Sequence, residues 1–165
     1  MSTRAFFTFT DADASFNVYK HHDGYPRGAA DTIAVALKWF TWQLPRFEAD
    51  EFAGAFCAAG KAHRMVNVIE GKRSLPEFLL EDNEYAQVMH GGGIRFMPQG
   101  KPADVIPKHC CDVEFRYEIT CKSGNDLHIV AYECSGWDGK LVEKCLYVGS
   151  FKRFVDWVKK EEEKV

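Results

Sequence analysis

Apolar and polar residues alternate through the C-terminal third of the chain with the two-residue period of a β-strand. The clearest case is Asp112–Cys121, where every second side chain is apolar or cysteine and those between are charged or polar. This alternation predicts a strand with one buried face. Turn-forming residues at 123–126 and 138–139 separate it from two further segments. The pattern therefore predicts three consecutive antiparallel strands.

The two turns set a register for these strands. The cross-strand pairs that it predicts are Ile119–Val130, Tyr117–Tyr132, Arg116–Glu133, Cys121–His128, Glu133–Lys144 and Tyr132–Cys145. In this register, Tyr117, Tyr132 and Cys145 lie side by side on the inner face, and charges alternate in sign across the outer face. We interpret the pair of Cys121 and His128 as a core contact.

The outer face of this predicted sheet is also partly apolar. Ile129, Ala131, Leu146 and Val148 share it with the charged residues. An apolar patch of this kind is normally covered, either by another segment of the chain or by a second copy of it. For a chain of this length, a homodimer is the simpler expectation.

The N-terminal segment predicts a β-hairpin, because alternating apolar residues flank the short loop at 11–14. Pairing about this loop places Phe9 opposite Phe16 and Phe7 opposite Val18. Both strands therefore give one apolar face to the core.

Further elements are predicted from the spacing of apolar residues and from capping and turn residues. They are a helix over Ala29–Gln43, a second helix over Ala49–Ala59, a short helix from Ser74, a strand over Ile94–Met97, an irregular connection over 98–107 and a C-terminal helix capped by Ser150. Together these elements predict an α+β fold, a mainly antiparallel sheet of about five or six strands with helices packed on one face. The length is that of one domain, over residues 1–165.

Composition excludes several classes of protein. The 165 residues are 46% hydrophobic and 14% aromatic, which excludes a disordered chain. The formal net charge is −3, so neither nucleic acid nor a membrane surface is expected as a partner. No apolar run approaches the ~18 residues of a membrane span, and the N-terminus lacks a signal-peptide core. We therefore expect a cytoplasmic protein.

Six cysteines lie at positions 57, 110, 111, 121, 134 and 145. Cytosolic thiols stay reduced, and buried cysteine packs like a small apolar residue. We interpret these cysteines as core thiols. The adjacent Cys110 and Cys111 lack the two-residue separation of zinc-binding pairs, so neither a metal nor another cofactor is expected.

The segment 19–28 is the strongest candidate for a binding site. The residues predicted to bind a ligand are His21, His22, Tyr25, Arg27 and Gly28. Positive or titratable side chains gather here just before a predicted helix, and the first backbone N–H groups of a helix bind phosphate or carboxylate well. The competing interpretation is that this segment only shapes the turn between a strand and a helix.

These features favour a non-catalytic binding protein for a small anionic ligand or a protein partner. The alternative is a small hydrolase or transferase in which His21 or His22 is the base and Cys110 or Cys111 is the nucleophile. No activating helix start or oxyanion loop marks the two cysteines in the sequence.

Three segments carry a resemblance to other sequences, namely Tyr19–Pro26, Leu44–Phe52 and Gly91–Arg95, the last followed by the antiparallel strands. They resemble a set of small bacterial and phage proteins, some of which are products of mobile gene cassettes such as those of integrons. The similarity covers most of the chain except residues 61–90. It implies a cytoplasmic accessory protein and carries over no catalytic residue.

Overall fold

A computed structural model of the chain describes residues 3–41, 48–62, 93–110, 112–121, 127–135 and 140–164. In chain order its elements are β1 (Ala5–Thr10), β2 (Ser15–Lys20), α1 (Pro26–Val35), the π-helix η1 (Ala36–Phe40), α2 (Ala49–Ala62), β3 (Ile94–Phe96), α5 (Pro102–His109), β4 (Phe115–Cys121), β5 (Leu127–Ser135), β6 (Val142–Ser150) and α6 (Phe151–Glu163). The helix predicted from Ser74, the two C-terminal turns and Cys111 lie outside the described residues.

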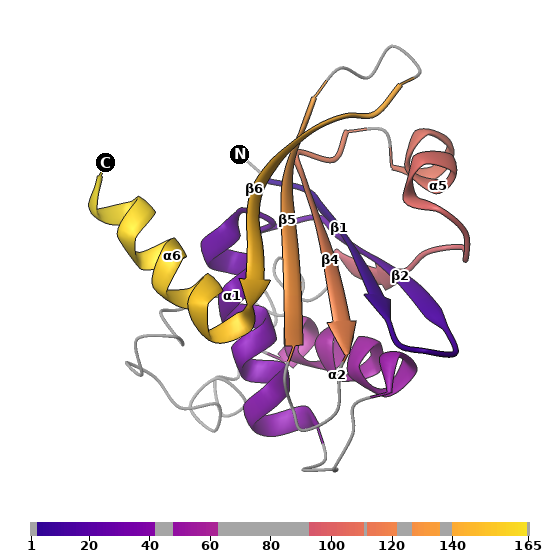
Figure 1. Cartoon of the computed structure of the whole chain (residues 1–165). Helices are drawn as coiled ribbons and strands as arrows, with labels where there is room; N and C mark the ends of the chain where they lie inside the picture. The colour runs from indigo at the N-terminus through magenta and orange to yellow at the C-terminus, as the bar shows by residue number, and fades with distance from the viewer. Residues whose placement is uncertain are drawn as a thin grey trace.

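The described strands form a six-stranded sheet in the order β3-β2-β1-β4-β5-β6. Neighbouring strands are antiparallel except β1 and β4, whose parallel pairing places Phe7 beside Tyr117 and Phe9 beside Ile119. This pair joins the N-terminal hairpin to the C-terminal strands (Figure 1). The predicted α+β fold with a mainly antiparallel sheet is thus confirmed.

Helices α1, α2 and α6 pack on one face of the sheet, which we call the inner face (Figure 1). The fully buried aromatic residues of this core are Phe7, Phe9, Phe52, Phe56, Tyr117 and Phe154. The centre of the Phe7 ring lies 4.5 Å from that of Phe56 and 4.8 Å from that of Tyr117. Aromatic pairs at such distances stabilise a core beyond the area that they bury.

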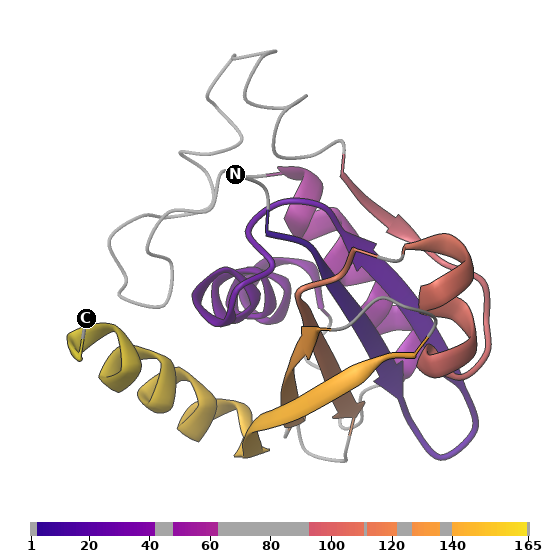
Figure 2. The same cartoon turned by 90° about the horizontal axis from the view of Figure 1, so that it is seen from above.

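Helix α5 packs on the opposite face, the outer face (Figure 2), where the sequence predicts an irregular connection. That prediction is wrong, because Val105 and Ile106 are buried in one apolar cluster with Phe6 and Tyr19. Pro102 is tolerated because it occupies the first turn, where its missing N–H has no helical partner to lose. Burial of apolar side chains, rather than local propensity, stabilises a helix this short.

Two of the predicted registers are confirmed. The confirmed pairs are Phe9–Phe16 and Phe7–Val18 between β1 and β2, and Glu133–Lys144 and Tyr132–Cys145 between β5 and β6. The short loop at 11–14 leaves the hairpin of β1 and β2 few alternative registers, so local sequence suffices there.

The predicted register between β4 and β5 is wrong by one residue. The observed pairs include Arg116–Tyr132, Tyr117–Ala131, Thr120–His128 and Cys121–Leu127. A shift of one residue turns every side chain of a strand to the other face. Ile129 and Ala131 therefore face the core, and Tyr132 lies on the outer face. Tyr117, Tyr132 and Cys145 are not grouped together, and Cys121 does not pair with a histidine.

Some boundaries also differ from prediction. Helix α1 begins at Pro26, three residues early, because proline fits the first turn, and η1 ends at Phe40, three residues before the predicted end. Strand β4 begins at Phe115 rather than at the predicted start. The cap of α6 is confirmed, because Ser150 Oγ accepts a hydrogen bond from the backbone N–H of Arg153 at 3.4 Å.

Tyr117 links the sheet to the loop after β2, and we expect its hydroxyl to contribute to stability. The fully buried side chain donates to the carbonyl of Gly24 at 2.8 Å. Tyr117→Phe leaves that carbonyl without this bond and should lower the free energy of unfolding in urea by about 1–3 kcal/mol. Tyr25→Phe, at an exposed position, is the control and should change it by less than about 0.5 kcal/mol. Equal effects of both substitutions would contradict a role for the bond.

Candidate functional site

The predicted site residues lie in the loop between β2 and α1 and in the first turn of α1. Asp23 has a left-handed backbone conformation, with a φ of 52°. Gly24 ties the loop down, because its N–H donates to the Thr3 carbonyl at 2.8 Å and its carbonyl accepts from Tyr117. A Cβ on Gly28 would lie 2.0 Å from the Asp23 carbonyl oxygen, so only glycine lets the loop fold onto the helix here.

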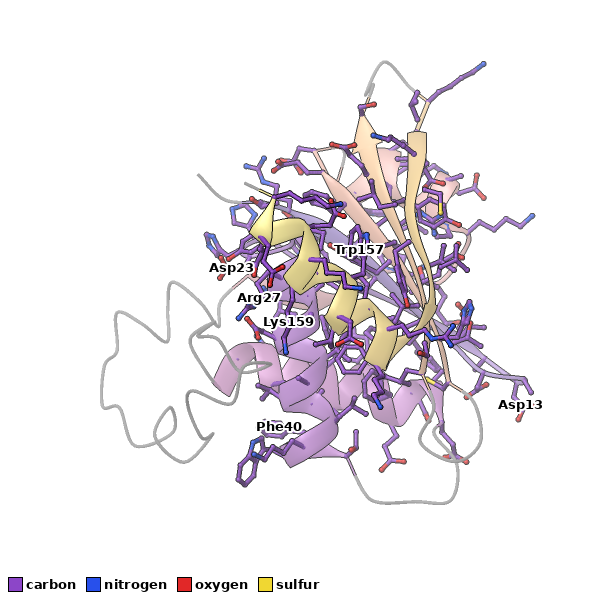
Figure 3. All side chains as sticks on the ribbon, turned by 60° about the vertical axis from the view of Figure 1, so that its left-hand side comes forward. Asp13, Asp23, Arg27, Phe40, Trp157 and Lys159 are labelled. Atoms are coloured by element: carbon purple, nitrogen blue, oxygen red, sulfur yellow. The ribbon has the colours of Figure 1, made fainter. Side chains whose placement is uncertain are left out.

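Arg27 connects α1 to α6. Its Nε donates to Asp31 Oδ2 at 3.2 Å and its Nη1 donates to Glu162 Oε2 at 2.6 Å, and the side chain is 9% exposed. Figure 3 shows Arg27 and Asp23 beside the C-terminal end of α6. Because two carboxylates balance the guanidinium charge, an external anion at this position would have to compete with both of them.

Lys20 is a buried cation beneath the same loop. It is 4% exposed, and its ammonium group donates to the backbone carbonyls of His22 and, at 3.3 Å, of Asp23. Burial lowers the pKa of Lys20 to about 8, although Asp23 and Asp31 act in the opposite direction. Lys20 therefore satisfies loop carbonyls at the cost of burying its own charge.

His21 has different partners from Arg27. Its Nδ1 lies 2.8 Å from the hydroxyl of Tyr19, and its backbone N–H donates to the Gly93 carbonyl at 2.9 Å. The ring of His22 meets it edge-on, with 4.7 Å between the ring centres. The structure thus divides the predicted site, because Arg27 pairs with carboxylates of α1 and α6, whereas His21 joins Tyr19 of the outer face.

Tyr19 and Arg95 belong to the same arrangement as His21. They pair across β2 and β3, and the guanidinium carbon of Arg95 lies 5.0 Å from the centre of the Tyr19 ring, a cation–π contact. Burial and then the Asp112 carboxylate raise the pKa of Tyr19, while Arg4 and Arg95 act in the opposite direction. The Tyr19 hydroxyl therefore stays protonated at neutral pH.

Arg4 adds a further donor beside Tyr19. Its Nη1 lies 2.8 Å from Asp112 Oδ2, but its Nε is buried and finds no hydrogen-bond acceptor among the residues that the structure describes. Unsatisfied buried donors are rare in native proteins, and an ion, a water molecule or a ligand often accounts for them. We call Tyr19, His21, Arg95 and Arg4 the Tyr19 cluster.

The outer face carries a second arginine–tyrosine stack, whose charge is neutralised. The Arg116 guanidinium lies 4.2 Å from the centre of the Tyr132 ring. Glu143 accepts hydrogen bonds from its Nε and Nη2, and Glu118 accepts one from its Nη1 at 2.6 Å. Arg95, in contrast, is exposed and forms no ion pair within the described part of the chain. Of these two stacks, the one at Arg95 offers an unbalanced charge to a ligand.

Sequence reasoning found His21 but missed Tyr19, Arg95 and Arg4 as its neighbours. One signal was present, because Tyr19 and His21 are two residues apart and so share a face of an extended strand. The arginines come from β3 and from the segment before β1, and only pairing between distant strands brings Arg95 to Tyr19. Tyr25, which precedes α1, is 39% exposed.

Among the described residues, Cys57, Cys121, Cys134 and Cys145 are free thiols. Cys57, Cys110, Cys121 and Cys134 are buried, as predicted, but Cys145 is exposed. Cys110 shares the apolar cluster of Tyr19, and apolar surroundings disfavour the thiolate that a nucleophile requires. Across these same residues, no group of three or more His, Cys, Asp or Glu side chains is arranged to hold a metal ion.

Two glycines provide a matched test of the loop packing. Gly28→Ala places a methyl group against the Asp23 carbonyl and should lower the free energy of unfolding by more than about 2 kcal/mol. Gly54→Ala, on the exposed side of α2 with no atom within 4 Å of the new Cβ, should raise it by about 0.5–1 kcal/mol. The free energy of unfolding is measured by urea denaturation. If Gly28→Ala leaves it unchanged, the loop does not pack closely against the helix at this position.

Lys20 should make the stability depend on pH. An unfolded lysine keeps its proton up to about pH 10.4, whereas folded Lys20 releases it near pH 8. Between these values the unfolded state binds more protons, so the contribution of Lys20 to the free energy of unfolding rises with pH by up to about 1.4 kcal/mol per pH unit. Below both values the contribution does not change with pH.

The comparison of wild type with Lys20→Met isolates this effect. Cys121, whose pKa burial raises to about 12, makes stability fall with rising pH, but it is present in both proteins and cancels in the difference. From about pH 8 to about pH 10 the wild type should gain stability relative to Lys20→Met in urea titrations. Lys108→Met, at an exposed position of α5, is the control with no such gain. A difference that is flat over this range would contradict the lowered pKa.

No helix of the described residues has the length and apolar character needed to cross a bilayer. Neither family models, nor curated proteins, nor solved structures provide a match to this chain. Its function must therefore follow from the chemistry of its own side chains. The Tyr19 cluster is the place where donors and positive charge are brought together without internal partners for all of them.

Proposed function

We propose that this chain is a non-catalytic binding protein that holds a small anionic ligand at the Tyr19 cluster. The proposal rests on the surroundings of Arg95. Its guanidinium is stacked on Tyr19 and has no carboxylate partner among the described residues, unlike Arg116 on the same face. An arginine oriented by an aromatic ring and lacking an internal counter-ion is well suited to bind carboxylate or phosphate.

The charge around the Tyr19 hydroxyl supports an anionic ligand. Arg4 and Arg95 act on it as cations and Asp112 acts on it as an anion, and Glu114 accepts a hydrogen bond from the backbone N–H of Arg4 at 3.4 Å. Since Asp112 is already paired with Arg4, Arg95 is the cation that a ligand would neutralise. The imidazole of His21, bonded to the same hydroxyl, supplies a further polar group.

The contacts favour binding over the alternative of a hydrolase or transferase. His21 is held by a tyrosine hydroxyl rather than by a cysteine or serine, and Cys110 is 7% exposed within an apolar cluster. A nucleophile in that position is not presented to a substrate in solution. The free thiols of Cys57, Cys121, Cys134 and Cys145 suit a reducing compartment, and the proposal places the protein in the cytoplasm.

The predicted homodimer stays a prediction, and two features of β6 bear on it. Glu143 and Lys144 lie along this last strand, and a bulge interrupts its pairing near Ala131 and Tyr132; both features oppose edge-to-edge association. The outer face of β4, β5 and β6 carries the exposed Val148, and a face-to-face dimer would use this surface.

Titration with inorganic phosphate and with acetate tests the proposed function. We expect the wild-type protein to bind at least one of these probes, with chemical-shift changes at Tyr19, His21 and Arg95. Arg95→Gln removes the unbalanced charge and should weaken binding by about tenfold or more. Because Arg95 is exposed, this variant should fold normally.

Arg153→Gln is the matched control, because it removes an exposed arginine from α6 and leaves the Tyr19 cluster intact. It should bind the probes as the wild type does. The proposal fails if the wild-type protein binds neither probe, or if Arg95→Gln and Arg153→Gln bind equally well.

A further inference from the structure

The Tyr19 hydroxyl has a single hydrogen-bond partner among the described residues, Nδ1 of His21 at 2.8 Å. Tyr19 is 5% exposed as a residue and lies in the cluster formed with α5, and its hydrogen bond to His21 is partly buried. A hydroxyl can donate or accept, and so can an imidazole nitrogen, depending on the tautomer. The direction of this one bond decides what the other nitrogen of His21 can do.

The proton of the Tyr19 hydroxyl settles the direction. If Nδ1 of His21 carried a proton, the hydroxyl would accept a hydrogen bond from it, and the hydroxyl's own proton would be left, in a partly buried position, without an acceptor among the described residues. Such an unsatisfied donor costs about 1–3 kcal/mol. If instead the hydroxyl donates to Nδ1, both groups are satisfied, and the neutral imidazole carries its proton on Nε2.

We infer that Tyr19 is a positioning residue that fixes neutral His21 with its proton on Nε2, so that His21 meets a ligand as a hydrogen-bond donor. The inference deepens the proposed function and rests on it for what Nε2–H binds. His21 shows no hydrogen bond from Nε2 to any residue that the structure describes. The groups available to a ligand are then both donors, Nε2–H of His21 and the guanidinium of Arg95.

A site made of donors selects for a group that only accepts. Carboxylate and phosphate oxygens accept hydrogen bonds and carry the negative charge that Arg95 favours. The protons of a ligand hydroxyl or amine would find a nearby acceptor only in the carboxylate of Asp112, which is already paired with Arg4. The same tautomer leaves Nε2 unable to act as a general base or as a metal ligand, because its lone pair is not available. His21 is thereby a specificity-determining residue of a binding site.

NMR of the protein labelled with ¹⁵N at histidine tests the tautomer directly. Long-range ¹H–¹⁵N correlations at a pH where His21 is neutral should show an unprotonated Nδ1 and a protonated Nε2. Tyr19→Phe keeps the buried ring and the stack with Arg95 but removes the donor, and it should give a mixture of tautomers at His21. Tyr132→Phe is the matched control. It removes the tyrosine hydroxyl from the other arginine–tyrosine stack, in which the arginine has no histidine partner.

The affinity for inorganic phosphate provides the second measurement. Tyr19→Phe should weaken it by about fivefold to tenfold, since His21 is no longer held as a donor, and Tyr132→Phe should leave it unchanged. A protonated Nδ1 in the wild-type protein, or an unchanged tautomer in Tyr19→Phe, would overturn the inference. If the expected tautomer is found but the wild-type protein binds neither phosphate nor acetate, the role of Tyr19 in fixing the tautomer stands and the proposed function is wrong.

Discussion

The parallel pairing of β1 with β4 is the constraint on which the rest of the structure depends. It places Phe7 beside Tyr117, with 4.8 Å between their ring centres, and so joins two antiparallel units into a single sheet. β1 is buried on both faces, because Ala5, Phe7 and Phe9 contribute to the inner core while Phe6 contributes to the outer cluster. Parallel neighbours need a long connection, so this contact is formed between parts of the chain that are far apart in sequence.

The same pairing positions the candidate site. Tyr117 of β4 reaches the Gly24 carbonyl and anchors the loop after β2, and β2 in turn carries Tyr19 on the outer face. On that face α5 covers one part of the sheet, while β4, β5 and β6 carry the Arg116 network. The two arginine–tyrosine stacks therefore differ through their surroundings. Glu118 on the same strand and Glu143 on β6 neutralise Arg116, whereas β3 brings Arg95 to Tyr19 with no such carboxylate.

The buried charged side chains of the loop region have structural roles, whereas the exposed Arg95 is available to a ligand. Arg27 is balanced by Asp31 and Glu162, and it holds the end of α6 against α1. Lys20 donates to loop carbonyls. Because these groups already have partners that compensate part of their desolvation, they shape the loop and leave recognition to the exposed Arg95.

The sequence by itself determined the elements whose pattern is local. The hairpin of Phe9 and Phe16 follows from a short turn, and the start of α6 follows from the hydroxyl of Ser150. Only tertiary structure decided the orientation of β5, because both sets of its alternate residues contain apolar side chains and packing against the helices selects the set with Ile129. It also decided the site, because Arg95 reaches Tyr19 through pairing between distant strands, which no local spacing of residues reveals.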